Sequence, residues 1–216
     1  MRLVPVPGVF KPHGDSLMLA DHLRHHQQLA GASVLDMCTG SGVLAITAAL
    51  SGAKSATAVD ISRRSVIAVR INAKLNGVRV RAIRGSLFSP VHGQLFDLIT
   101  SNPPYLPSTS DELPDRGSSR AWEAGLRGRQ FIDRICIDAR RYLRPHGTLL
   151  LVHSSICSEH ATVEALQSQG FQVQVVARSL GPLGPRVRAR AELLRARGLL
   201  SDSDVEEILI FRAALA

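Results

Sequence analysis

Short apolar runs alternate with segments of helical spacing along the first hundred residues, and this alternation restricts the possible folds more than any other feature. The runs at 33–37 (SVLDM), 55–60 (SATAVD), 78–85 (VRVRAIRG) and 96–100 (FDLIT) have the length and composition of buried strands. The segments between the first three runs place their apolar residues at helical intervals. Strands separated by helices form parallel sheets with helices on both faces. The sequence therefore predicts an α/β fold.

The second half of the chain continues the pattern but ends differently. The same reasoning predicts helices over 121–143 and 158–168, and strands at 147–153, 171–178 and 206–214. A further helix is predicted over 16–29, before the first strand. The last two strands have no ordinary crossover helix between them, which predicts antiparallel pairing around an insertion. We expect a Rossmann-like sheet of seven strands, mostly parallel, with an antiparallel last strand.

The length and cysteine content indicate one domain in a reducing compartment. The 216 residues contain no Gly/Ser linker, so we expect a single domain over 1–216, with an N-terminal helical segment 1–30 and an insertion at 181–204. The three cysteines have no CxxC spacing, no signal peptide is evident, and no apolar run approaches the roughly 18 to 20 residues that a membrane span requires. We therefore expect a cytoplasmic protein with no membrane contact.

Positive charge is the main departure from an average composition. The formal net charge is +8, which favours an acidic partner such as nucleic acid or a ribosomal surface, although it also serves solubility. The densest basic segment is predicted to be helical. It can contact RNA or the ribosome, or it can be a solvated helix face. Its arginines are Arg186, Arg188, Arg190, Arg195 and Arg197.

Three histidines have a spacing that suits metal ligands. His22, His25 and His26 lie at i, i+3 and i+4 of the predicted helix 16–29. No cysteine or carboxylate is placed beside them, and a wet helix face explains them as well. We predict no metal.

A glycine turn follows the first strand and indicates a cofactor site. Gly40, Gly42 and Ala45 satisfy the loose G-x-G-x-x-G/A pattern, so NAD fits the spacing. However, Asp36 places a carboxylate at the end of the strand, where it would repel a pyrophosphate. That carboxylate suits the α-amino group of a sulfonium ligand, directly or through water. We therefore predict S-adenosylmethionine as the cofactor.

Residues after the next two strands complete the predicted cofactor site. Asp60 ends the second strand, where a carboxylate can accept both ribose hydroxyls, although an Asp there can also be a helix N-cap. Ser86 follows the third strand, where it can meet the adenine edge, and Leu87 can pack against the ring. We include Cys38 and Ile61 in the same site.

The segment SNPPYLPS (101–108) follows the fourth strand and indicates the reaction. A planar amide or aromatic amine is a poor nucleophile, because its nitrogen lone pair is delocalised. The side-chain oxygen of Asn102 and the carbonyl of Pro103 can both accept from such an NH2 group and orient it toward a methyl donor. Pro104 keeps the segment rigid and Tyr105 can stack on the planar group. The alternative is a simple proline turn.

These motifs resemble a known family. DMCTGSG (36–42) and SNPPY (101–105) resemble the amino-methyltransferases, and NPPYLPS with AWEAGLRGRQFIDR (121–134) resembles the HemK-type release-factor glutamine methyltransferases. VFKPHGDSLMLADHL (9–23) is similar to the N-terminal segment of the small eukaryotic and archaeal branch of that family. The resemblance implies a class I methyltransferase fold, with Asp15 and Ser16 beside the cofactor. Ser86 is a departure, since an Asp is frequent there.

The resemblance also implies a substrate, and alternatives stay open. It implies methyl transfer to a glutamine side-chain amide of a protein such as a translation release factor, assisted in many small-branch members by a small activating subunit. The acceptor geometry equally fits N6 of adenine or N4 of cytosine, so a nucleic-acid methyltransferase is the second hypothesis and a non-catalytic cofactor-binding scaffold the third. Trp122 and Glu123 can gate the pocket or only pack. Arg127 and Arg129 can face an acidic substrate or solvent.

Overall fold

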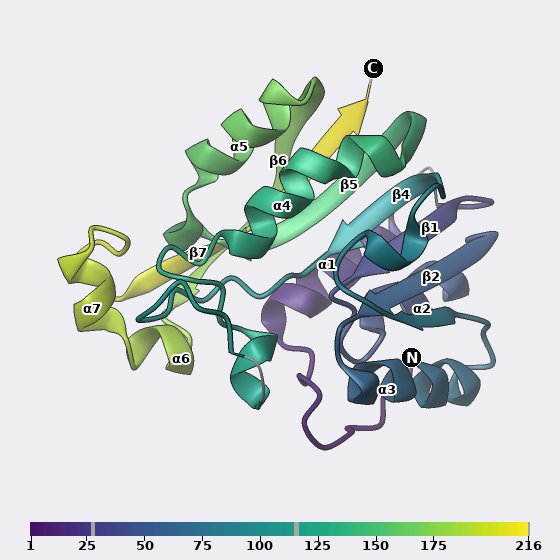
Figure 1. The fold of residues 1–216 in the computed structure, drawn as a ribbon, viewed down its shortest axis with the longest axis horizontal. Coiled ribbons are helices and arrows are strands. Elements are labelled where there is room, and N and C mark those ends of the chain that lie inside the picture. The colour runs from purple at the N-terminus through teal and green to yellow at the C-terminus, as the bar shows by residue number, and fades with distance from the viewer. Residues whose placement is uncertain (27–28, 115–116, 216) are drawn as a thin grey trace.

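The computed structural model describes residues 1–26, 29–114 and 117–215, and within these ranges seven strands form one sheet. The spatial order is β3-β2-β1-β4-β5-β7-β6, and Figure 1 shows this sheet running through the centre of the molecule. Neighbours pair in parallel from β3 to β5, whereas β7 pairs antiparallel with both β5 and β6. The predicted architecture is confirmed. The strands are β1 (Ser33–Met37), β2 (Ser55–Asp60), β3 (Arg81–Arg84), β4 (Phe96–Ser101), β5 (Leu143–Ser154), β6 (Phe171–Pro182) and β7 (Val205–Leu215).

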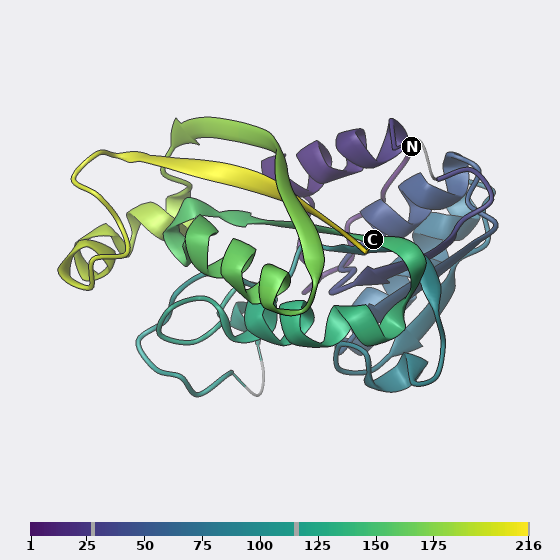
Figure 2. The ribbon, with the colours of Figure 1, turned by 90° about the horizontal axis from the view of Figure 1, so that it is seen from above.

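Helices cover both faces of the sheet, as Figure 2 shows from above. Successive strand residues point to opposite faces, so Val34 and Leu98 pack toward α1 and α2, whereas Leu35 and Ile99 pack toward α4 and α5. One face carries α1 (Gly14–Arg24), α2 (Val43–Leu50) and α3 (Arg63–Leu75), and the other carries α4 (Gln130–Asp138) and α5 (Glu159–Ser168). No helix of the described residues is long and apolar enough to cross a membrane.

Two helices are shorter than the sequence predicts. The helix expected over 16–29 ends at Arg24, because its buried face stops at Leu23 and polar residues follow; residues 27–28 lie outside the described residues. The prediction of a helix over 121–143 is wrong for the first part of that range. The chain is irregular up to Arg129, α4 then begins at Gln130, and a short 3-10 turn follows α4 before β5.

Backbone geometry explains the missing helical turns. Gly125 and Gly128 have φ values of +80° and +70°, which a right-handed helix cannot accommodate. The amide of Ala124 instead donates to the carbonyl of Leu106 at 3.0 Å, so this segment pairs with the chain that follows β4. A contact across 18 residues thus replaces local helical bonding.

The insertion between β6 and β7 contains two short helices rather than one. They are α6 (Pro185–Arg188) and α7 (Ala191–Ala196), separated at Arg190, whose φ of −121° interrupts the helix. In Figure 1 both lie beside the loop that precedes α4. The insertion is therefore a folded element next to the end of β4.

Candidate active site

A large cavity opens at the carboxyl ends of β1 to β4, where α/β sheets bind ligands. Its volume is about 1290 Å³, above the range of roughly 300–1,000 Å³ that is usual for a single small ligand. The cavity therefore has room for a cofactor and the group that receives its methyl. The predicted site residues that line it are Ser16, Cys38, Gly40, Asp60, Ile61, Ser86, Leu87, Asn102, Pro103, Pro104 and Tyr105. Asp36 and Gly42 do not line it.

The glycine turn after β1 forms one wall. Cys38, Gly40 and Gly42 have φ values of +56°, +55° and +86°, so the turn relies on left-handed backbone at three positions. A Cβ on Gly42 would lie 3.1 Å from the side chain of Val69 on α3, which makes glycine the residue that fits there. Gly42 thus serves close packing of α2 against α3, while Gly40 faces the cavity.

Asp36 lies beneath this turn instead of in the cavity. It is fully buried, and its Oδ2 accepts from Thr39 Oγ1 at 2.5 Å and from the amide of Ala45 at 3.1 Å. Oδ1 has no hydrogen-bond partner among the described residues. Burial raises the pKa of Asp36 from its ordinary value of 3.8 to about 7. The placement gives no direct contact with a cavity ligand, which corrects the simplest form of the prediction.

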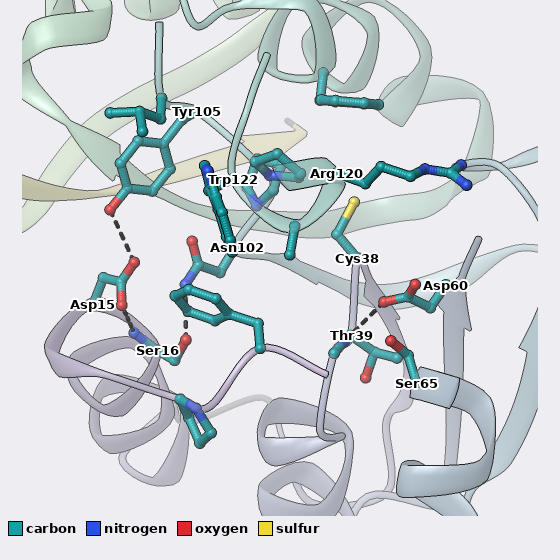
Figure 3. A pocket seen from close by; sticks show the side chains of 18 of the residues that line it. Asp15, Ser16, Cys38, Thr39, Asp60, Ser65, Asn102, Tyr105, Arg120 and Trp122 are labelled. Atoms are coloured by element: carbon teal, nitrogen blue, oxygen red, sulfur yellow. Dashed lines mark hydrogen bonds between the residues drawn. The ribbon is translucent and has the colours of Figure 1, made fainter. Parts of the chain in front are cut away.

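Asp60 ends β2 and lines the part of the cavity that is predicted to hold the cofactor, here called the cofactor side. Its Oδ2 accepts from the amide of Gly40 at 2.9 Å and its Oδ1 from the amide of Ser62 at 2.8 Å, so the carboxylate is fixed between two loops (Figure 3). Burial raises its pKa, and these hydrogen bonds oppose the rise. The N-cap of α3 is Ser62, whose hydroxyl accepts from Ser65. The N-cap interpretation of Asp60 is therefore wrong.

Four further predicted residues line the same side. Ser86 and the buried Leu87 follow β3, and the half-exposed Ile61 follows β2. The thiol of Cys38 also lines the wall, and burial raises its pKa far above the ordinary value, so the thiol stays protonated. The predicted residues of this side consequently offer one carboxylate, one hydroxyl, one thiol and an apolar surface, and the hydroxyl side chains of Thr39, Ser62 and Ser65 also line the cavity.

The segment 101–108, predicted to hold the methyl acceptor and here called the acceptor motif, is hydrogen-bonded to the start of α1. Asn102 Nδ2 donates to Ser16 Oγ at 2.8 Å, and the Tyr105 hydroxyl donates to Asp15 Oδ2 at 2.9 Å, as Figure 3 shows. Burial, together with the Asp15 carboxylate, raises the pKa of Tyr105, so the phenol is neutral. Sequence reasoning placed Asp15 and Ser16 near the cofactor but missed these bonds to the motif. No local signal links residues 86 and 90 positions apart.

Residues outside this motif hold its second half in place. Cys157 Sγ donates to the carbonyl of Tyr105 at 3.0 Å, and a Cβ on Gly128 would collide with that same carbonyl oxygen. Leu106 donates to the carbonyl of Trp122 at 2.6 Å, which sets the indole on the cavity wall. These contacts hold the motif in one geometry.

Arginines of the insertion bind this loop. Arg190 donates to the carbonyl of Pro107 at 2.7 Å and forms an ion pair with Glu123. The guanidinium of Arg186 lies 4.2 Å from the ring centre of Trp122 and 5.4 Å from that of Phe10. Two further arginines also have partners within the chain: Arg195 bonds to Asp204, and Arg197 to the carbonyls of Ser108 and Leu126. Arg188 is exposed.

The remaining candidates have other roles. Arg129 turns away from the cavity lining, forming an ion pair with Asp133 at 2.6 Å and donating to Thr162 at 2.9 Å, whereas Arg127 is exposed. Among the described residues, no group of three or more His, Cys, Asp or Glu side chains is arranged to hold a metal ion.

Sequence comparison assigns the family. The profile of the methyltransferase small domain matches residues 1–113. A Methanocaldococcus jannaschii protein, named provisionally as a protein N5-glutamine methyltransferase, is 36% identical over 172 residues, which cover 80% of this chain and 85% of that protein. The chain belongs to the HemK-type methyltransferase family. It is also 36% identical to a release factor glutamine methyltransferase from Gloeobacter violaceus over 161 residues, 70% of this chain. It spans 56% of that longer protein.

Solved structures agree with the fold. The E. cuniculi Mtq2–Trm112 complex, titled as responsible for methylation of the eRF1 translation termination factor, matches with a TM-score of 0.64 and 20% identity, covering 97% of this chain and 99% of that one. Related structures of the same fold hold S-adenosylmethionine or S-adenosylhomocysteine. The family model and the relatives named as methyltransferases show that this HemK-type protein is an S-adenosylmethionine-dependent enzyme. The left-handed turn at Gly40 and the fixed carboxylate of Asp60 fit that cofactor.

Proposed function

We propose that this enzyme transfers a methyl group from S-adenosylmethionine to the side-chain amide nitrogen of a glutamine in a protein. The observation that carries the proposal is the bond from Asn102 Nδ2 to Ser16 Oγ. Because this bond turns the amide nitrogen toward Ser16, Oδ1 is the hydrogen-bond acceptor that Asn102 can offer to a ligand in the cavity. A hydrogen-bond acceptor in that position selects an NH2 group as the ligand.

The chemistry requires two acceptors and little else from the protein. Asn102 Oδ1 and the Pro103 carbonyl would hold both protons of the acceptor amide and favour positive charge on its nitrogen. The new N–C bond forms as the S–C bond of the sulfonium breaks, S-adenosylhomocysteine leaves, and the nitrogen loses a proton to solvent. Pro104 keeps the two acceptors in place, and the ring of Tyr105, whose hydroxyl is tied to Asp15, would stack on the amide plane.

On the cofactor side, each residue has a role that suits its placement. Asp60 would accept the ribose hydroxyls, and Ser86 and Leu87 would meet the adenine. Asp36 would act indirectly: its unpartnered Oδ1 needs a donor, which a water bound to the cofactor ammonium can supply. Ser16, Cys38, Gly40 and Ile61, which also line the cavity, would enclose the rest of the cofactor.

The names of related proteins suggest the substrate and a partner. Relatives are named as release factor glutamine methyltransferases, and one related structure is a complex with Trm112. We therefore propose a release factor as the substrate and a small activating subunit as a partner. Methylation that appears only after a Trm112-like protein is added would support the second part.

The test uses tritiated S-adenosylmethionine with a release factor and with whole lysate, followed by separate protease and nuclease digestion. Label released by protease and recovered as N5-methylglutamine supports the proposal. Label recovered in nucleosides would instead support the nucleic-acid methyltransferase hypothesis.

Variants separate the acceptor site from cofactor binding. Asn102→Ala should lower kcat about 100-fold, the usual effect of removing one preorganised polar group, while cofactor affinity changes less than about threefold. Asn76→Ala, the same substitution outside the cavity, is the control. An equal loss of both properties in Asn102→Ala would mean that Asn102 is structural.

A further inference from the structure

Among the described residues, the acidic side chains on the acceptor side of the cavity are all engaged within the protein. Asp15 accepts from the Tyr105 hydroxyl, and Glu123 is paired with Arg190. Glu206 accepts from Ser154 Oγ and from the amide of Gly184, both at 2.8 Å. Each of these three carboxylates therefore has a partner inside the wall, and for Glu123 that partner is a cation.

Two arginines of the same cavity have no carboxylate partner among the described residues. Arg134 on α4 and Arg186 on α6 are both exposed and both line the cavity. Arg120, also in the lining, is different, because it lies on the cofactor side and its charge lowers the pKa of Asp60. The described lining consequently offers a ligand two guanidinium groups that have no carboxylate partner within the described residues.

Arg186 is held in a way that prepares it for a ligand. Its guanidinium lies over the ring of Trp122 and near that of Phe10, so its faces are used and its N–H edge stays available for a planar acceptor. The bonds of Arg190 to Glu123 and Pro107 anchor the insertion to the same loop. Little rotamer freedom is left for a ligand to remove.

We propose that Arg134 and Arg186 bind acidic side chains of the protein substrate close to the glutamine that is methylated. This inference rests on the proposed function, because it takes a protein segment as the occupant of the acceptor side. Planar carboxylates match the guanidinium edge in bidentate geometry. The preferred substrate segment therefore carries Asp or Glu near its glutamine.

The observations favour an acidic protein segment over nucleic acid. Binding of RNA or DNA depends on many exposed cations, yet Arg190, Arg195 and Arg197 of the insertion are engaged internally. The insertion 181–204 contains no aromatic residue on which a base could stack.

The test measures binding and turnover separately. Fluorescent glutamine peptides with acidic, neutral or basic neighbours are titrated in the presence of S-adenosylhomocysteine, which permits no turnover. In Arg186→Ala and Arg134→Ala, Kd for the acidic peptide should rise about threefold to tenfold at low salt, and Kd for the neutral peptide should stay constant. Arg188→Ala is the matched control, since Arg188 is exposed on the same helix and does not line the cavity. In turnover, KM should rise and kcat should not change.

Several results would overturn the proposal. Equal weakening of all three peptides would show that Arg186 only builds the wall, and an equal effect of Arg188→Ala would show a general charge effect. Loss of RNA binding in Arg186→Ala with unchanged peptide binding would assign the surface to nucleic acid. If the acidic peptide binds as expected but no glutamine is methylated even after a Trm112-like protein is added, the proposed function fails while the binding surface stands.

Discussion

The buried carboxyl of Asp36 should make the stability of this enzyme depend on pH in an unusual direction. In the folded chain its pKa is about 7, whereas its ordinary value is 3.8. Between these values the folded state binds more protons than the unfolded state, so the free energy of unfolding falls as pH rises. The stabilising effect of the proton is complete below about pH 4 and is lost by about pH 7.

The magnitude follows from the rise in pKa. Each pH unit corresponds to about 1.4 kcal/mol, so the full rise amounts to roughly 4 kcal/mol, of which about 2 kcal/mol falls between pH 5.5 and 7. Asp36→Asn removes the titration and keeps an oxygen to accept from Thr39 and Ala45. The variant should therefore gain about 2 kcal/mol relative to the natural enzyme between pH 5.5 and pH 8.

Urea unfolding without cofactor, at pH 5.5 and pH 8, measures this gap. The exposed Asp202→Asn variant is the control and should give the same difference from the natural enzyme at both pH values. A gap for Asp36→Asn that does not change with pH would refute the reasoning, because it would mean that Asp36 does not titrate in this range. At pH 8 the variant should also bind S-adenosylmethionine more weakly, since the negative charge beneath the glycine turn is gone.

Three further substitutions test the cavity. Asp60→Ala should raise the Kd for S-adenosylmethionine at least about tenfold in calorimetric titration, because two loop amides and the proposed ribose contact lose a charged acceptor. An unchanged Kd would exclude the ribose contact. Ser16→Ala should lower kcat about tenfold, because the side-chain amide of Asn102 is no longer oriented. Ser16→Thr keeps the hydroxyl and should restore most of kcat. An equal loss of kcat in both variants would contradict a hydrogen-bonding role for Ser16. Gly128→Ala should lower the free energy of unfolding, measured in urea, by about 2–4 kcal/mol, because the residue has positive φ and its new Cβ would collide with the carbonyl of Tyr105. Gly77→Ala, where φ is positive but the space is open, should lower it by about 1 kcal/mol. Similar losses in both variants would show that the collision does not contribute.

Local patterns in the sequence were sufficient for the sheet and for the cofactor side. Strand alternation predicted the order of elements, and the missing crossover helix predicted the antiparallel β7. Gly40 and Asp60 could be found because they lie in the turn after β1 and at the last residue of β2, and parallel strands bring their carboxyl ends to one edge. The role of Asp36 was less accessible, since its position inside β1 decides that it is buried.

The acceptor side depends on contacts between residues that are far apart in the sequence, which local patterns cannot predict. Helical periodicity over 121–143 was outweighed by the left-handed Gly125 and Gly128, and two glycines three positions apart were the available signal against a helix. The charge of the insertion likewise indicated a surface for acidic partners, but most of its arginines bind the protein's own carbonyl and carboxylate groups. Counting charges could not reveal these partners.

The two sides of the cavity are therefore built by different means, and this has a consequence for specificity. The cofactor side is formed at the ends of neighbouring strands, where amides of the loops after β1 and β2 bind Asp60. The acceptor side is held by bonds that join distant segments, from Ser16 to Asn102 and from Arg190 to Pro107, 86 and 83 residues apart. Changes in α1 or in the insertion can alter the acceptor wall without touching the glycine turn. Substrate preference can thus change while cofactor binding is retained, which is why Arg186 is the position at which we expect selectivity to be set.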